Sequence, residues 1–204
     1  MLQWVRDAVG QHVFAVHRLD KPTAGLMAFA TSPEAASLLS RAFRERRVAK
    51  RYAAIVRGHV DSPFDVDYPL GAVRDRHARS GDEPKDAVTR VSPIGQSEIG
   101  VPVGRYQTAR YTLAVLSPLT GRRHQLRRHM KHVFHPIIGD RKYGDRDHNR
   151  FLEAEGFRRL ALCSIGLEIE GLETDFCYST TPDQEWLAMA GLLGLDFSLL
   201  PKSY

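Results

Sequence analysis

The sequence predicts an α+β fold built on a mixed, largely antiparallel sheet with flanking helices. Several segments alternate apolar and polar residues, as half-buried strands do. A few other segments repeat apolar residues at helical spacing, and the two kinds of segment do not follow one another in a regular βαβα series. The chain of 204 residues contains no internal repeat and no evident linker, so we expect a single domain that spans residues 1–204.

The N-terminal part of the chain is expected to begin with a short helix and to continue through a turn bounded by apolar runs. Ser32, Pro33 and Glu34 form a strong helix start, with a capping serine, a proline at the first helical position and an acid in the first turn. This helix should bury one face and end near Arg46. The elements expected up to residue 58 are a helix at 3–9, a strand at 13–17, its continuation or hairpin partner at 26–30, this helix, and a half-buried strand at 48–58.

The middle of the chain is the least periodic part, and residues 71–86 are expected to form a mobile surface excursion. Thr120 is placed to cap a short helix whose inward residues would be Leu126, Met130 and Val133. The remaining expected elements are a strand at 87–91, a loop or hairpin at 94–106, a strand at 110–116, a turn at 135–140, a helix at 151–157, a hairpin of 160–169 with 174–178, and an amphipathic helix at 183–193.

The charge of the chain is concentrated in two basic patches. The net charge is +5 and the pI is about 9.4, which alone says little about partners. Residues 41–57 contain seven Lys or Arg and one acid, and residues 122–150 contain nine Lys or Arg and three acids. This distribution predicts a polyanionic partner that contacts both patches.

Nothing in the sequence suggests a membrane or an exported protein. No apolar run approaches the roughly 18 residues of a membrane span, and the N-terminus lacks a signal-peptide pattern. Cys163 and Cys177 do not have a metal-type spacing and are expected to be buried thiols of a cytosolic protein. The expected location is therefore the cytoplasm.

Four histidines in the second basic patch raise the question of a metal site. No cysteine or carboxylate joins them at ligand spacing, and the arginines between them would repel a cation. No phosphate-binding glycine loop of the GxxxxGK[ST] or GxGxxG type is present either. We expect no metal and no cofactor, and a polar helix surface that faces nucleic acid, for His124, His129, His132 and His135.

The stretch from residue 17 to residue 25 combines turn chemistry with reactive groups. Apolar runs lead into it and out of it, and between them lie a cation, a carboxylate, a proline and a glycine. Such a turn presents Asp20 at the end of a strand. If this carboxylate is catalytic, other parts of the sequence should supply a nearby cation, a side chain on which a nucleobase can stack, and a surface that binds the substrate.

Three motifs occur in order along the chain. Residues 17–25 read HRLDKPTAG, residues 50–52 read KRY, and residues 120–127 read TGRRHQLR. Together they resemble the motif set of the RluA-type pseudouridine synthases, and the resemblance runs over nearly the whole chain. It implies the pseudouridine synthase fold, with a catalytic cleft across the middle of the sheet. Residues 10–14, 87–89, 127–130 and 135–140 also resemble the bacterial branch of this family that acts on uridine 65 of tRNA, in the acceptor stem region.

The resemblance implies a role for five residues. Asp20 would be the catalytic aspartate, and Arg18 would fill the gap left in the RNA helix or steady the extruded base. Tyr52 would stack on the uracil and take part in proton handling at C5. Leu126 would help to wall the base pocket, and Arg127 would pair with Asp20 from across the cleft. The residues expected to contact RNA are Arg44, Arg47, Lys50, Arg122, Arg123, Arg128 and Lys131.

The chemistry of pseudouridine formation fits these residue types. The bond from N1 to C1′ must break and C5 must join C1′, so the base has to leave the RNA stack at a cost of a few kcal/mol. Stacking on an aromatic side chain recovers about 1–3 kcal/mol. An ionised carboxylate is needed to attack a sugar or ring carbon, or to stabilise cationic character at C1′. Burial disfavours an ionised carboxylate and an adjacent guanidinium favours it, so a paired arginine suits such a site.

The sequence departs from the family pattern in two places. Members normally carry an Asn-Lys-Pro-type motif and a pair of strands before the first motif, and we expect this chain to lack that N-terminal segment. Its absence would leave a sheet edge or an apolar face uncovered, which affects stability more than identity. Cys163 and Ser164 also stand where relatives tend to have a His-Ala pair, outside the catalytic motifs.

Three functions remain open from the sequence. A pseudouridine synthase acting on tRNA is favoured, with rRNA as the alternative substrate, and no obligatory protein partner is evident. A second hypothesis is an RNA-binding module without catalysis, although Asp20, Tyr52 and Arg127 are all present. A third is a carboxylate glycosidase, which would need two carboxylates flanking the scissile bond, whereas the motifs offer only Asp20.

Overall fold

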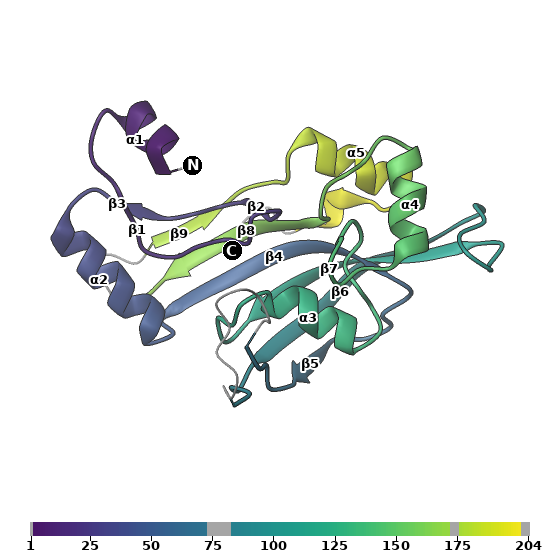
Figure 1. Ribbon diagram of the computed structural model, residues 1–204, viewed down its shortest axis with the longest axis horizontal. Coiled ribbons are helices and arrows are strands. Elements are labelled where there is room, and N and C mark those ends of the chain that lie inside the picture. Colours follow the sequence, from purple (N-terminus) through teal and green to yellow (C-terminus); the bar gives the residue numbers. More distant parts are fainter. Residues whose placement is uncertain (1, 73–82, 172–175, 201–204) are drawn as a thin grey trace.

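A seven-stranded sheet forms the centre of the structure, a computed structural model that describes residues 2–72, 83–171 and 176–200 (Figure 1). All of its strand pairs are antiparallel except β2 with β8, which are parallel. The predicted α+β class with a mixed, largely antiparallel sheet is therefore confirmed. The order of the strands is β2 (Ala24–Gly25), β8 (Leu162–Ile169), β4 (Val48–Arg57), β7 (Ala109–Pro118), β6 (Val88–Ile99) and β5 (Phe64–Asp67), and β9 (Phe176–Ser179) pairs with β8 outside this order.

Helices lie around this sheet, and a small two-stranded hairpin forms near the N-terminus, with β2 of the main sheet between its two strands in the chain (Figure 1). The hairpin pairs β1 (Phe14–Ala15) with β3 (Phe29–Ala30), so only residues 29–30 of the expected segment 26–30 are the antiparallel partner of the strand that leads into the turn. The helix after the turn contacts both strands of the hairpin. The helices are α1 (Leu2–Val9), α2 (Pro33–Arg44), α3 (Gln125–His132), α4 (Arg146–Ala154) and α5 (Gln184–Leu192), followed by the short 3-10 helix η1 (Phe197–Leu199).

The main core is centred on the C-terminal half of β4. Ala53, Ala54, Ile55 and Val56 are all fully buried, so the predicted alternation of a half-buried strand is wrong for this half. The reason is that β4 is a central strand, paired with β7 on one side and β8 on the other, and both faces of its C-terminal half are covered. A central strand covered on both faces has a continuous apolar run.

A second, smaller core holds α2 against the sheet. Ala42 of α2 packs with Val48, Leu167 and Ile169, at the start of β4 and the end of β8. The helix begins as predicted, since the Ser32 hydroxyl accepts a hydrogen bond from the backbone N–H of Ala35 at 3.1 Å and Pro33 is the first helical residue. This packing places α2 at the end of the sheet where β4 begins and β8 ends (Figure 1).

The predicted cap of α3 is wrong. The helix begins at Gln125 rather than after Thr120, and His124 is its N-cap residue. The Thr120 hydroxyl instead donates to the side-chain oxygen of Gln125 at 2.6 Å and accepts from the backbone N–H of Val88 at 3.2 Å. Thr120 therefore ties the segment before α3 to the start of β6.

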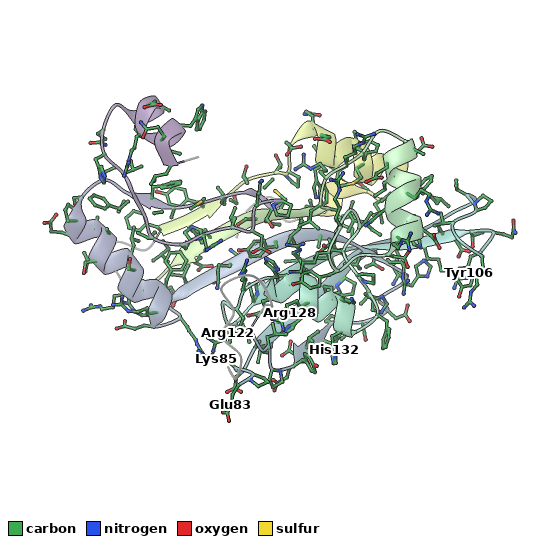
Figure 2. The ribbon with its side chains drawn as sticks, viewed as in Figure 1. Glu83, Lys85, Tyr106, Arg122, Arg128 and His132 are labelled. Atoms are coloured by element: carbon green, nitrogen blue, oxygen red, sulfur yellow. The ribbon has the colours of Figure 1, made fainter. Side chains whose placement is uncertain are left out.

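Strands are longer in the middle of the chain than the sequence suggested. β6 covers residues 94–99 of the region expected to be a loop or hairpin, and a bulge between Pro93 and Gly95 leaves Ile94 as the extra residue opposite β7. β5 was not expected at all. Figure 2 shows that the hairpin of β6 and β7 extends away from the body of the molecule, with Tyr106 near its tip. The helix expected at 151–157 spans 146–154, because the Asp145 carboxylate caps it.

Two expectations fall partly outside the described residues. The surface excursion predicted at 71–86 includes residues 73–82, and the strand predicted at 174–178 includes residues 174–175, none of which the structure describes. The closing hairpin of β8 and β9 is confirmed where it is described. Over the described part of the chain, no helix has both the length and the apolar character that a membrane crossing requires.

Candidate functional site

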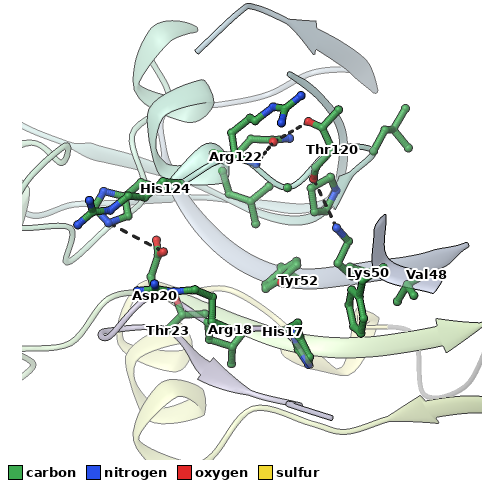
Figure 3. Close-up of a pocket in the computed structure, with 18 of the residues that line it drawn as sticks. His17, Arg18, Asp20, Thr23, Val48, Lys50, Tyr52, Thr120, Arg122 and His124 are labelled. Carbon is green, nitrogen blue, oxygen red and sulfur yellow. Dashed lines mark hydrogen bonds and ion pairs between the residues drawn. The ribbon is translucent and has the colours of Figure 1, made fainter. Parts of the chain in front are cut away.

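A cleft of about 650 Å³ opens between the Asp20 turn, the end of α2, strand β4 and the segment that leads into α3 (Figure 3). Figure 3 shows Asp20 and Arg18 on one wall, His124, Arg122 and Thr120 on the opposite wall, and Tyr52 and Lys50 between them. Most of the residues that the sequence analysis selected are therefore brought together. The predicted site residues that line the cleft are Arg18, Asp20, Arg44, Lys50, Tyr52, Arg122, Arg123 and Leu126.

The turn that carries Asp20 is anchored to the sheet. The backbone N–H of Thr23 donates to the carbonyl oxygen of Asp20 at 2.8 Å, and the next residues pair with β8 as the short parallel strand β2. Gly25 has a φ of +104°, and a Cβ at this position would overlap the backbone of Ser164. Only glycine allows this close approach, so the sequence at Gly25 holds the turn in place.

Arg127 joins the Asp20 turn to the opposite wall. Its Nη1 donates to Oδ2 of Asp20 at 3.3 Å, and its side chain is only 7% exposed while that of Asp20 is 22% exposed. Its other two nitrogens form a fork on Asp140, with Nε to Oδ2 at 2.7 Å and Nη2 to Oδ1 at 2.8 Å. The guanidinium plane is thus fixed by Asp140, and Nη1 is left to donate to the carboxylate of Asp20.

Asp140 is a site residue that the sequence analysis missed. Its side chain is 1% exposed, and Oδ1 also accepts from the backbone N–H groups of Lys142 and Tyr143. Burial raises the pKa of Asp140, but the hydrogen bonds from Arg127 and the backbone outweigh it, and the pKa lies below its ordinary value of 3.8. Gly139, with a φ of +74°, passes so close to the backbone of Arg159 that a Cβ would overlap it. The sequence did contain a signal for Asp140, since it is an acid that follows an apolar turn within a strongly basic segment.

His124 also lies in the cleft, on the other side of Asp20. Its Nε2 is 3.9 Å from Oδ1 of Asp20, and its Nδ1 hydrogen bonds with the hydroxyl of Tyr143 at 2.9 Å. Burial is the main cause of its lowered pKa; Asp20 raises the pKa, and Arg127 and other nearby cations lower it. The imidazole is therefore largely neutral at neutral pH. Tyr143 in turn lies under the guanidinium of Arg127, 5.1 Å from it, so it contacts both partners of Asp20.

Tyr52 lies on β4 between the two walls. Burial raises the pKa of its hydroxyl to about 12, a hydrogen bond with Ser164 lowers it, and the nearby Asp20 carboxylate raises it further. The phenol therefore keeps its proton at neutral pH. Ser164 is the residue opposite Tyr52 in the pairing of β4 with β8, so the departure noted at 163–164 places a hydroxyl beside the candidate stacking residue.

His17 forms part of the cleft at the start of the turn. Its Nε2 accepts a hydrogen bond from the backbone N–H of Ala28 at 2.8 Å, and its ring stacks on Phe43 with the centroids 4.6 Å apart. Burial, and secondly the charge of Lys50, lower its pKa to about 4. His17 is thus a neutral residue that supports the turn, and not a cation that contacts phosphate.

The charge of the cleft is strongly positive. One carboxylate, Asp20, faces six Lys or Arg side chains in its lining. Lys50 reaches across to the carbonyl oxygen of Thr120 at 3.4 Å (Figure 3), and burial followed by the charge of Arg46 lowers its pKa. Such a field attracts a polyanion and concentrates it at Asp20. The six lining cations are Arg18, Arg44, Arg46, Lys50, Arg122 and Arg123.

Three of the predicted RNA contacts lie outside the cleft. Arg47 donates to the carbonyl oxygens of Glu170 and Gly171, at 2.8 and 3.0 Å, and pairs with Glu45. Arg128 donates to the carbonyl oxygen of Gly71 at 2.9 Å, on the outer side of α3 (Figure 2). Lys131 is exposed on the same helix.

The expectation that four histidines face nucleic acid is wrong for His129. This residue is fully buried and hydrogen bonds with the Thr89 hydroxyl and the carbonyl oxygen of Tyr68. His132 is exposed and stacks on Tyr68, and His135 hydrogen bonds with the carbonyl oxygen of Arg57. Within the described ranges, no group of three or more His, Cys, Asp or Glu side chains is arranged to hold a metal ion.

Comparisons with known proteins show which family this chain resembles. Residues 1–132 match the family model described as RNA pseudouridylate synthase. The chain is 43% identical over 203 residues to the tRNA pseudouridine synthase C of Haemophilus ducreyi, a match that covers 97% of this chain and 84% of that protein. It is 47% identical over 175 residues to the tRNA pseudouridine synthase C of Salmonella typhi, covering 83% of this chain and 67% of that protein.

Solved structures with a similar fold point in the same direction. The structure of human RNA pseudouridylate synthase domain containing 1 superimposes with a TM-score of 0.71 at 27% sequence identity, over 88% of this chain and 72% of that chain. That of human RNA pseudouridylate synthase domain containing 4 has a TM-score of 0.72 over 96% of this chain and 81% of that chain; at 24% identity it supports the fold alone.

Proposed function

This chain belongs to the RNA pseudouridylate synthase family, and we propose that it isomerises a uridine of tRNA to pseudouridine at Asp20. It is an isomerase, as the family and the curated relatives indicate. Those relatives are tRNA pseudouridine synthases, which supports tRNA as the substrate. Their matches cover most of this chain, which supports one catalytic domain over residues 1–204. We propose the cytoplasm as the place of this reaction.

The observation that carries the proposal is the position of Asp20 in the cleft. A flipped uridine that enters this cleft meets a carboxylate held by Arg127 and an aromatic ring from Tyr52. In the reaction the N1–C1′ bond breaks, the base turns, and C5 joins C1′; the hydrogen on C5 leaves as a proton and N1 takes up a proton. The atoms balance without an oxidant, a reductant or water.

Four lining residues have a part in this proposal. Asp20 supplies the ionised carboxylate beside the sugar and the base. Tyr52 stacks on the uracil, and because its hydroxyl stays protonated it serves as a donor or relay for the proton and not as a phenolate base. Leu126, 7% exposed, walls the base pocket, and Arg18 occupies the space that the base leaves in the RNA.

The direct test is to incubate the protein with unmodified bulk tRNA and to map pseudouridine by carbodiimide-primer extension or mass spectrometry. We expect one new pseudouridine, at uridine 65, with the wild-type protein and none with the Asp20→Asn variant. Product in rRNA but not in tRNA would overturn the substrate. Product in neither, with RNA still bound, would favour a binding module without catalysis.

A further inference from the structure

A second cavity, of about 530 Å³, lies on the other side of the Asp20 turn. Pro22 lines this cavity, whereas Asp20, two residues earlier, lines the catalytic cleft. Residues 20–22 therefore form part of the wall between the two spaces. Arg127 and Asp140 also line the second cavity, and Arg127 reaches from there to Asp20.

The lining of this cavity is dominated by cations. Besides Arg127 it contains Arg141, Lys142, Arg158 and Arg159, and its only carboxylate is Asp140. Both oxygens of that carboxylate already accept from Arg127. The acid in the lining is thus neutralised within the wall, and the remaining charge of the cavity is positive.

Two of these cations are available to a ligand. Arg159 pairs with Asp183 and Glu185, outside the cavity lining, and Arg141 pairs with Glu153 at 3.4 Å. In the part of the chain that the structure describes, Lys142 and Arg158 have no carboxylate within 4.0 Å, and both are exposed. The ammonium of Lys142 lies 5.5 Å from the centre of the Tyr143 ring, and its side chain is exposed.

The chemistry of these two cations suits a phosphate group. A guanidinium binds phosphate through paired N–H donors, and an ammonium does so as a point charge. In the proposed function, the RNA strand has to continue on both sides of the flipped uridine. The lining cations of the cleft serve one side of the Asp20 turn, and the second cavity offers cations on the other side.

We propose that the second cavity is a subsite for a backbone phosphate of the RNA strand next to the target uridine, with Lys142 and Arg158 as its ligands. This inference rests on the proposed function for the identity of the strand. Because Arg127 and Asp140 form both the wall of the subsite and the support of Asp20, a phosphate bound here fixes the strand relative to the catalytic carboxylate.

The test is the salt dependence of tRNA binding by two charge-reversal variants, Lys142→Glu and Arg158→Glu. Filter binding with unmodified tRNA should show a loss of affinity of about fivefold for each variant at about 0.15 M salt, and the slope of log K against log salt should become shallower by about 1. Arg158→Lys should retain most of the affinity. The matched control is Arg150→Glu on α4, which removes an exposed arginine that lines neither cavity.

The outcomes separate this inference from the proposed function. Unchanged affinity and slope in both reversal variants would overturn the subsite, even if the wild-type protein forms pseudouridine in tRNA. Loss of tRNA affinity in both, with no product from the wild type, would support the subsite and reject the reaction. A thermal shift caused by inorganic phosphate, absent from the reversal variants while their tRNA binding is normal, would assign the cavity to a free phosphate and overturn the RNA assignment.

Discussion

The guanidinium of Arg127 donates a hydrogen bond to the carboxylate of Asp20 across 107 positions of sequence, at 3.3 Å. The contact is not a simple pair, because the fork of Arg127 on Asp140 determines how the guanidinium is oriented. The proposed catalytic carboxylate is thus held by a cation that a second, fully buried carboxylate positions. The site depends on Asp140 as well as on the residues of the motifs.

Replacing Asp20 by asparagine should abolish pseudouridine formation and leave RNA affinity within a few-fold of wild type. The amide keeps the size of the side chain and its place in the turn, but it supplies no ionised carboxylate. Product formation and tRNA binding are measured on the same preparation. Retained turnover would exclude Asp20 as the catalytic carboxylate.

Replacing Asp140 by asparagine should lower the free energy of unfolding by about 3 kcal/mol, because a buried Arg127 loses its main partner. The lowered pKa of Asp140 means that the pair stabilises the protein above pH 3.8, the ordinary value, and that this stability is lost as the pH falls through the lower pKa of the folded state. Urea denaturation at several pH values measures both effects.

The control for this variant is Asp147→Asn, which removes the exposed carboxylate that faces Arg150. Exposed pairs contribute at most about 1 kcal/mol, so this change should cost little. A variant at Asp140 as stable as the control would show that Arg127 does not depend on that carboxylate.

Tyr52→Phe should keep RNA affinity and lose about 10²-fold or more in kcat, since the ring remains and the hydroxyl that we propose handles the proton is gone. Tyr52→Ala should in addition weaken binding, because stacking contributes about 1–3 kcal/mol per base. With the pKa of the hydroxyl near 12, its ionisation should cause no fall in rate up to pH 10. Full turnover by Tyr52→Phe would show that the hydroxyl has no role in the reaction and that Tyr52 acts through its ring alone.

The two arginines near the end of α2 should behave differently when their charge is reversed. Arg44→Glu should weaken tRNA binding and flatten its salt dependence, because this side chain is exposed and lines the cleft. Arg47→Glu should mainly lower stability, because Arg47 is engaged with the carbonyl oxygens of Glu170 and Gly171. Filter binding and urea denaturation separate the two effects, and equal salt slopes for both variants would contradict this assignment.

The free energy of unfolding should decrease as the pH is lowered from 6.5 towards 4, because His17 then has to take up a proton. Its pKa of about 4 in the folded state lies below the ordinary value of 6.5, so its contribution is complete above pH 6.5 and is lost as the pH falls towards 4. The contribution is about 3 kcal/mol at most. His17→Gln should reduce this slope of stability against pH and not remove it, because burial also lowers the pKa values of His129 and His148. An unchanged slope would rule out the buried, neutral state of His17.

Much of the fold was predictable where a segment carries its own signal. The cap at Ser32, the strand beginning at Val48 and the hairpin of β8 and β9 follow from local residue types and periodicity. The prediction failed where pairing overrides the local pattern. β6 runs through Pro93 because it pairs with β7 on both sides of the bulge. Thr120 does not cap α3, because its hydroxyl donates to the side chain of Gln125 instead.

The sequence by itself determined the reactive groups of this protein: Asp20 on a proline-containing turn, Tyr52 on a strand, Arg127 in a motif, and arginine-rich flanks. Short-range residue order is enough for these because turns and strand faces depend on neighbours along the chain. Only the tertiary structure decided that Asp140 orients Arg127, that His124 and Tyr143 complete the surroundings of Asp20, and that a second basic cavity lies behind the turn. Those contacts depend on the order of the strands in the sheet, which brings distant segments together.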